Sequence, residues 1–389
     1  MKFASRIIVL VWVAGLWCEG QDNTWGPCEQ EVNCELPACF CANNTQGPEA
    51  VPATQRPHIV VLTFNDAVNE RNFDYYSKML TTGWKNSNGC PVRLTLFVSD
   101  TWTNYTQVQK LWLAGAEVAA FSKSGYGQTE YFYKTITKEK LREEIGGQKQ
   151  NFVKKAKIPP YAIRGFRIPY FSAAGDDMFD VLAEENYDYD SSLLITRDSM
   201  QAPPTWPATL TYKWPFKCKL GHCPLSNHSS IWEVPVQMLY DLNDTFECQY
   251  IDACTNAPTT EEGAFQLLWR NFLPYYKSRT PFVLNMRATW LNTDFQRTAF
   301  HRLVYSIMDM PEVYFVTMSQ LVDWMKNATS LNEIQNFEPW LCPKRELYQS
   351  QSSTLRGDTT LLPLALVSAF IVHRIIFYNI HVIYNVSLP

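Results

Sequence analysis

The sequence predicts an α/β fold in which a mainly parallel sheet carries helices on its outside. Strand-like and helix-like segments alternate over about residues 60–330. The chain has 389 residues and is 46% hydrophobic, which is enough for one large core or two ordinary domains. Polar residues also recur directly after the predicted strands. In barrels built from alternating parallel strands and helices, the functional site lies at this edge, where the strands end.

The predicted strands are short and rich in apolar and β-branched residues. The first begins at His58 with an unbroken apolar stretch, HIVVLTF, which indicates a buried strand. Asn65 and Asp66 follow it, and Ser122, Tyr170 and Arg287 follow later strands, although each alone is an ordinary strand-to-loop transition. The predicted strands are 58–64, 92–98, 117–121, 162–170, 189–194, 281–288 and 313–317.

The predicted helices lie between these strands. One of them closes at Gly115, and the longest has acidic and basic residues at helical spacing on a polar face. The predicted helices are 70–82, 106–115, 137–156, 176–187, 295–309 and 319–326.

The N-terminal residues 1–20 have the pattern of a secretory signal peptide. Lys2 and Arg6 precede an apolar run, and small residues stand before Gln21. A membrane anchor is the alternative, but the apolar run is too short to span a bilayer. A net charge of −4 and the lack of a basic run argue against nucleic acid as a partner.

Ten cysteines remain after residue 20, which in a secreted chain favours disulfides. Four of them lie in residues 21–50, a Cys-rich extension for which a zinc site is the rival interpretation. Local pairs are expected for Cys218 with Cys223 and for Cys248 with Cys254, and the remaining pairing is open. Secretion is also favoured by six glycosylation sequons, at Asn43, Asn104, Asn227, Asn243, Asn327 and Asn385.

Residues 51–342 form the predicted main domain, and the chain changes character after Cys342. Residues 343–360 are a polar linker, and residues 361–389 are a hydrophobic tail. Within the linker, the small residues Ser352 and Ser353 are followed by a polar spacer and then the apolar tail, an order that resembles a lipid-anchor signal. The pair His373 and Arg374 interrupts the apolar tail. Two alternatives to a lipid anchor are therefore kept: the tail spans a membrane, or it does neither.

The order of several motifs resembles the polysaccharide deacetylase family, and more narrowly the insect chitin deacetylase-like proteins. These motifs are LTFNDAVNE, RIPYF, YDYDSSL, IWEVPV, DACTNAPT, TPFVLNMRATWL and NFEPWLC, and they extend over nearly all of residues 28–342. The resemblance implies a distorted (β/α) barrel of the NodB-homology type. It also implies metal-assisted hydrolysis of N-acetyl groups on chitin, in which a divalent metal, usually zinc, activates water.

Carried over residue by residue, the resemblance leaves most of the reactive groups substituted. Asp66 stands at a metal-ligand position, but Asn65 stands at the base position, and an amide cannot take a proton from water. Phe121 and Gly125 stand at the two histidine-ligand positions. Arg287 stands at the general-acid position, where arginine keeps its proton throughout the accessible pH range.

The motifs RIPYF, YDYDSSL and TPFVLNMRATWL are retained apart from the substitution at Arg287. The resemblance implies that Arg167 orients the base and that the backbone beside Tyr170 stabilises an oxyanion. The other positions expected at the substrate are Asp190, Ser191, Trp232, Leu284 and Trp290.

No zinc is therefore expected, and we expect Arg287 to pair with Asp66 in place of the metal. Restoring Asn65→Asp, Phe121→His, Gly125→His and Arg287→His together should revive metal uptake, and Asn65→Asp alone should not. No histidine is placed to rebuild the site or to activate Ser122 or Ser124, and Tyr126, Gln128 and Glu130 would make a poor zinc site.

Sugar binding does not need the metal, because aromatic rings stack on pyranose faces. Tyr170, Trp206, Trp214, Trp232 and Trp290 lie in or near the motif loops. We expect a secreted, catalytically impaired protein that binds chitin or another N-acetylglucosamine polymer in the matrix of an arthropod gut lining or cuticle. The alternatives are an active deacetylase with unusual ligands, and a cell-surface adhesion or receptor protein that keeps only the fold.

Overall fold

The computed structural model describes residues 26–342, which belong to one compact unit. The predicted signal peptide, linker and hydrophobic tail lie outside these residues, so membrane attachment through the tail stays a prediction. Within residues 26–342 we find no helix that is both long enough and apolar enough to cross a membrane.

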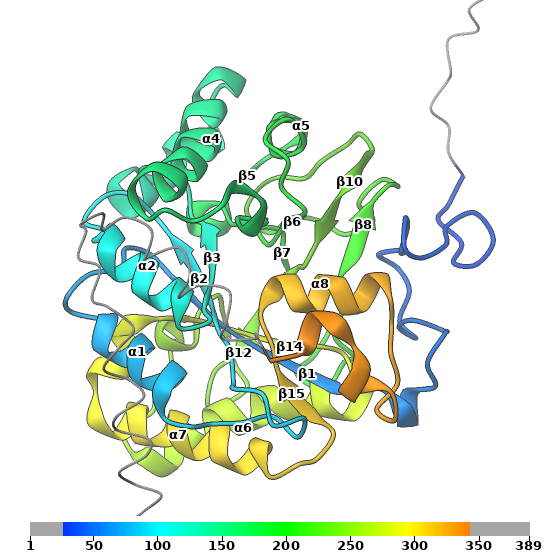
Figure 1. Cartoon of the computed structure of the whole chain (residues 1–389). Helices are drawn as coiled ribbons and strands as arrows, with labels where there is room; N and C mark the ends of the chain where they lie inside the picture. The colour runs from blue at the N-terminus through cyan, green and yellow to red at the C-terminus, as the bar shows by residue number, and fades with distance from the viewer. Residues whose placement is uncertain (1–25, 343–389) are drawn as a thin grey trace, which may run out of the picture. The chain divides into compact units, whose positions relative to one another are not determined.

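A curled, mainly parallel sheet forms the centre of the molecule (Figure 1). Its strands run in the order β14-β1-β2-β3-β4-β6-β10-β8, and β15 also pairs with β1. The pairings are parallel except for β10 with β8, and β8 and β14 lie at opposite ends, so the barrel is incomplete. The bounds are β1 His58–Asn65, β2 Thr95–Val98, β3 Glu117–Ala120, β4 Gly165–Phe166, β6 Tyr189–Asp190, β8 Ala208–Leu210, β10 His228–Glu233, β14 Phe282–Arg287 and β15 Val313–Phe315.

Three two-residue strand pairs lie outside this sheet. They are β5 Ala173–Ala174 with β9 Gly221–His222, β7 Leu194–Ile195 with β11 Val236–Gln237, and β12 Leu239–Tyr240 with β13 Glu247–Cys248.

Helices surround the sheet and confirm the predicted α/β class (Figure 1). Each apolar helix face packs on the strands, and α6 and α7 pack against each other. The bounds are α1 Phe73–Thr81, α2 Tyr105–Leu113, α3 Glu130–Lys134, α4 Lys138–Lys155, α5 Asp176–Glu184, α6 Glu261–Ser278, α7 Asp294–Met308 and α8 Met318–Lys326.

Two predicted strands are wrong in extent, and one long helix was not predicted. The segment 162–170 keeps only β4, because Pro169 begins a 3-10 turn in which Tyr170 has a φ of 58°. The segment 189–194 divides between β6 and β7, which belong to different sheets. Helix α6 was missed although Thr260 caps its start and accepts a hydrogen bond from the amide of Gly263.

Five disulfides join all ten cysteines of the described chain. The two local pairs, Cys218–Cys223 and Cys248–Cys254, are confirmed. In the extension the pairs Cys28–Cys41 and Cys34–Cys39 use all four cysteines, so the zinc alternative there is wrong. The fifth, Cys90–Cys342, joins positions 252 residues apart.

The Cys-rich extension covers the edge strand β8. The amide of Phe40 donates to Thr209 Oγ1 at 3.1 Å, and the amide of Thr209 donates to the carbonyl of Phe40 at 3.0 Å. Because an uncovered edge strand invites pairing with another chain, the extension protects this end of the sheet.

His58, the first residue of β1, is fully buried and makes stability depend on pH. Its ring packs on Phe272 and Tyr276, neither ring nitrogen has a hydrogen-bond partner within the described residues, and burial with the nearby Arg279 charge lowers its pKa from 6.5 to about 3. Between these pH values the unfolded chain binds a proton here that the folded chain does not.

We therefore predict that His58 weakens folding as pH falls from 6.5 towards 3, by up to about 1.4 kcal/mol per pH unit. Urea unfolding of His58→Leu should show a shallower loss of stability with acid than the natural protein. The exposed His222→Gln is the control and should keep the natural slope. Equal slopes for all three proteins would refute the assignment to His58.

Candidate functional site

A groove of about 910 Å³ opens at the carboxyl ends of β1, β2, β3 and β14. Parallel strands end at one edge, so the loops after them converge there. The loop after β1 contributes Asn65 to Asn72, and the loop after β2 contributes Trp102 and Asn104. The groove is completed by Tyr126 and by the segment Arg287–Asn292.

Asn65 lies at the floor of the groove and is hydrogen-bonded to the buried Arg167. The guanidinium Nη1 donates to Asn65 Oδ1 at 3.0 Å and to Asn285 Oδ1 at 2.8 Å. Asn65 Nδ2 in turn donates to the hydroxyl of Tyr250 at 3.1 Å. The amide oxygen and the amide nitrogen are therefore both used in hydrogen bonds, and an amide cannot take a proton from a water molecule as a carboxylate can.

The remaining donors of Arg167 are directed to Ser191, in the motif YDYDSSL. Nε donates to the carbonyl of Ser191 at 2.9 Å, and Nη2 donates to the Ser191 hydroxyl at 2.8 Å. Within residues 26–342, Arg167 makes no hydrogen bond to a carboxylate, and burial lowers its pKa to about 10. The structure thus brings the predicted positions 65, 167 and 191 together around a buried cation.

A pair of buried acids, Asp190 and Glu233, balances this charge from behind. Burial raises the pKa of Asp190, and burial together with the Asp190 charge raises the pKa of Glu233 further, so the pair holds a proton more readily than free carboxyl groups do. The Asp190 carboxylate accepts from the amide and hydroxyl of Ser192 at 2.9 and 2.7 Å. Asp190 is fully buried and has no exposed surface for a sugar.

Asp66 is the carboxylate beside the missing ligands. Its backbone has a φ of 96°, and its Oδ1 accepts from the Ser99 hydroxyl at 3.2 Å. Burial raises the pKa of Asp66, while the amide of Ala67, the Ser99 hydroxyl and the Arg287 charge oppose the rise. Such strained backbone at the mouth of a groove is typical of positions shaped by a site.

The predicted pairing of Arg287 with Asp66 is wrong. Arg287 Nε instead donates to Asp252 Oδ2 at 2.8 Å, and the Thr289 hydroxyl donates to the same oxygen at 2.6 Å. Asp252 lies in the 3-10 turn Ile251–Ala253, inside the loop closed by the Cys248–Cys254 disulfide. This loop brings the Asp252 carboxylate into hydrogen-bond contact with Arg287 at the end of β14, whereas the Arg287 charge acts on Asp66 only through space.

Aromatic rings fill the neighbourhood of the lost histidine positions. Phe121 is fully buried, and its ring centroid lies 5.0 Å from that of Tyr126. The Tyr126 hydroxyl lies 2.7 Å from the Tyr250 hydroxyl, which completes a chain of contacts to Asn65. None of these groups is a favourable zinc ligand.

Gly125 lies close to Asp66 but leaves no room for a larger residue. A Cβ atom on it would lie 3.9 Å from Asp66 Oδ1, and also 2.5 Å from the Ser99 Cβ. Its φ of 53° adds strain to any substitution. The restoration expected from the sequence therefore needs a fifth change, at Ser99.

The residues present do not fit a zinc ion in this groove. Asp66 is one carboxylate, whereas zinc sites use three or four nitrogen, sulfur or oxygen ligands. In the described chain, the group of histidine, cysteine or acidic side chains close enough to share a metal is Cys28, Cys34 and Cys39, and their sulfurs are in disulfides. The fixed charge of Arg287 also opposes a cation beside Asp66.

No protein-family profile matches the chain. It is 33% identical over 310 residues to chitin deacetylase 8 of Bombyx mori, covering 79% of this chain and 80% of that protein. The chain belongs to the chitin deacetylase family. It is also 30% identical over 334 residues to chitin deacetylase 1 of Bombyx mori, covering 83% of this chain and 61% of the relative's length.

Among solved structures, the chain is similar to the chitin deacetylase of the fungal pathogen Colletotrichum lindemuthianum. The TM-score is 0.35 at 11% identity, covering 70% of this chain and 92% of that one.

Within this chitin deacetylase family member, the aromatic residues expected to stack on sugar lie mostly in the core. Trp232 and Trp290 are 3% and 1% exposed, and Trp206 and Trp214 are also buried, so none presents a free face. Leu284 is fully buried inside β14. Tyr170 is half-buried, and its hydroxyl donates to the carbonyl of Gln128 at 2.9 Å. The predictions for Trp232, Trp290 and Leu284 as sugar contacts therefore do not fit the structure.

Trp102 is the aromatic residue that sequence reasoning missed. It lines the groove, its side chain is 74% exposed, and its backbone has a φ of 65°. A bulky residue held exposed in this strained conformation indicates a functional position. It lies in a loop that matches none of the family motifs, so only its place beside a strand end could have suggested it.

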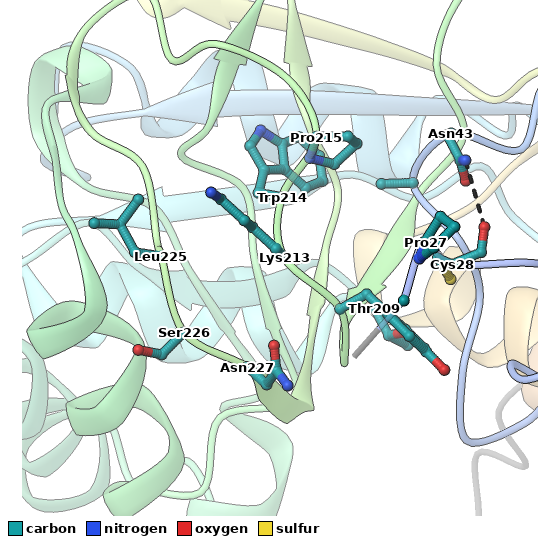
Figure 2. A pocket seen from close by; sticks show the side chains of 13 residues that line it. Pro27, Cys28, Asn43, Thr209, Lys213, Trp214, Pro215, Leu225, Ser226 and Asn227 are labelled. Carbon is teal, nitrogen blue, oxygen red and sulfur yellow. Dashed lines mark hydrogen bonds between the residues drawn. The ribbon is translucent and has the colours of Figure 1, made fainter. Parts of the chain in front are cut away.

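A second cavity of about 630 Å³ lies between the Cys-rich extension and the segments 209–215 and 225–227 (Figure 2). Asn43 and Asn227, both sequon residues, line it, and Asn43 Nδ2 donates to the carbonyl of Cys28 at 3.4 Å. Its lining shares no residue with the groove, so the motif residues do not take part in it.

Proposed function

We propose that this chitin deacetylase family member binds chitin or related N-acetylglucosamine polymers in the groove without removing their acetyl groups. The observation that carries the proposal is the amide of Asn65, which occupies the base position and is held by Arg167 and Tyr250. Its relatives are named for deacetylation of chitin, which supports the ligand class. The loss of base, acid and metal ligands argues against the reaction.

The groove offers groups suited to a neutral sugar. Trp102 presents an exposed ring for stacking, and Asn69, Asn292 and Thr289 supply amide and hydroxyl groups. Neutral amides and hydroxyls pair well with sugar hydroxyl and acetamido groups, since each can donate and accept.

An extracellular location suits this role. Five disulfides in residues 26–342 need an oxidising compartment, and the predicted signal peptide and sequons support secretion. We infer that the protein acts in a chitin-containing matrix, such as a gut lining or cuticle.

In protein from which N-linked glycans have been removed enzymatically, Trp102→Ala should weaken binding of chitohexaose at least about tenfold, which corresponds to about 1.4 kcal/mol, because an exposed stacking face is lost. Calorimetric titration measures the affinity, and an acetate assay on the same samples should detect no release. Tyr161→Ala is the control, since Tyr161 is 77% exposed and lies outside the groove.

Catalytic release of acetate by the natural protein would overturn the proposal in favour of an active deacetylase. The adhesion or receptor role would be favoured instead if chitohexaose binds neither the natural protein nor protein from which the N-linked glycans have been removed.

A further inference from the structure

The sequon residue Asn104 lies in the wall of the groove. The sequence Asn104-Tyr105-Thr106 is an acceptor for N-linked glycans, and Asn104 is exposed. Its side chain caps α2, with Oδ1 accepting from the amides of Thr106 and Gln107 at 3.1 and 3.3 Å. Within residues 26–342 its Nδ2 donates no hydrogen bond, so a sugar on Nδ2 leaves the cap intact.

The loop that carries Asn104 also carries Trp102 and is held in place. The Thr103 hydroxyl donates to the carbonyl of Ser99 at 2.6 Å and accepts from the amide of Val68 at 3.2 Å. The amide of Asn104 donates to the carbonyl of Val68 at 2.7 Å. A glycan on Asn104 would therefore start two residues from the exposed ring, on a loop that is hydrogen-bonded to Val68 in the loop after β1.

We propose that Asn104 carries an N-linked glycan that covers Trp102 and competes with polysaccharide for the groove. The competition rests on the proposed function, whereas the modification and the covering of Trp102 do not. In the transfer step, Nδ2 forms a bond to C1 of the first sugar of a lipid-diphosphate-linked oligosaccharide. The C1–O bond to the diphosphate breaks, the lipid diphosphate leaves, and one amide proton is released.

The chemistry of the glycan suits this role. Its first two sugars are N-acetylglucosamines, the same unit that chitin repeats. The Trp102 ring can therefore stack on a sugar of the glycan or on a sugar of chitin. Because the glycan is tethered, its effective concentration at the groove is of the order of millimolar. The glycan thus acts as a covalent competitor whose occupancy sets how much of the secreted protein binds chitin.

The test uses the full chain secreted from insect cells, with mass spectrometry of the Asn104 peptide. Asn104→Asp removes the sequon and keeps a capping oxygen, and Thr106→Ala removes the sequon and keeps Asn104. Thr106→Ser keeps the sequon. Thr45→Ala removes the sequon of Asn43, which lines the other cavity, and is the matched control.

The natural protein, Thr106→Ser and Thr45→Ala should bind chitohexaose about fivefold to tenfold more weakly than Asn104→Asp and Thr106→Ala. Hydroxyl-radical oxidation of Trp102 should rise in the last two variants and after enzymatic removal of the glycan. An unmodified Asn104 peptide, or a glycan whose removal changes neither oxidation nor affinity, would overturn the inference. A different result would be that no form binds chitohexaose, although oxidation of Trp102 still rises when the Asn104 glycan is absent. Chitin binding and competition with polysaccharide would then be refuted, whereas the covering of Trp102 by the glycan would be confirmed.

Discussion

The fourfold variant Asn65→Asp, Phe121→His, Gly125→His and Arg287→His is expected to take up no zinc while Ser99 is present. A Cβ at position 125 would lie 2.5 Å from the Ser99 Cβ, closer than real contacts allow. The histidine or the loop must then shift, and the ligand geometry is lost. The natural protein and Asn65→Asp alone should likewise bind no zinc, since they keep too few ligands.

Adding Ser99→Gly to the fourfold variant should restore zinc binding. Complete ligand sets contribute roughly 10–16 kcal/mol, so the gain should be measurable even if strain at Gly125 removes several kcal/mol. Zinc content after dialysis measures uptake, and circular dichroism checks that each variant is folded. Ser99→Gly alone is the control and should stay metal-free. Stoichiometric zinc in the fourfold variant with Ser99 retained would contradict the steric argument.

Sequence reasoning succeeded where the site depends on strand order. Asn65, Arg167 and Ser191 follow strands of one parallel sheet, so the motif order was enough to predict that they meet. It failed where a loop decides the outcome. The partner of Arg287 is Asp252, whose position depends on the turn closed by Cys248–Cys254, and that turn has no periodic pattern.

The aromatic residues show the same limit. Composition and motif position cannot tell a tryptophan in the core from one at the surface, because both suit a large apolar ring. Trp290 follows a strand end but turns into the core in the 3-10 turn Ala288–Asn292, whereas Trp102 is held outward by its left-handed backbone. Backbone conformation in these turns, which the sequence pattern did not reveal, separates the two cases.

Arg167→Met should destabilise the domain by about 3–5 kcal/mol, the cost of breaking a buried charged network. The substitution leaves Asn65 Oδ1 and the Ser191 hydroxyl without the donor from Arg167, and it removes the shortest hydrogen bond to Asn285 Oδ1. It also removes the positive charge that acts on the buried acids Asp190 and Glu233. Typical domains have only about 5–15 kcal/mol of stability, so much of the total is lost. Urea unfolding at neutral pH measures the change.

Arg142→Met is the matched control for that measurement. Arg142 is hydrogen-bonded at the surface instead, to the Glu184 carboxylate, and both side chains are 44% exposed, so its loss should cost less than about 1 kcal/mol. Equal losses for the two variants would refute a special role for the buried network. The expected result is a large loss in the free energy of unfolding for Arg167→Met alone. It would mean that Arg167, which the family resemblance assigns to orienting a base, stabilises the floor of the groove in this protein. The groove can then keep its shape for a sugar although Asn65 cannot take a proton.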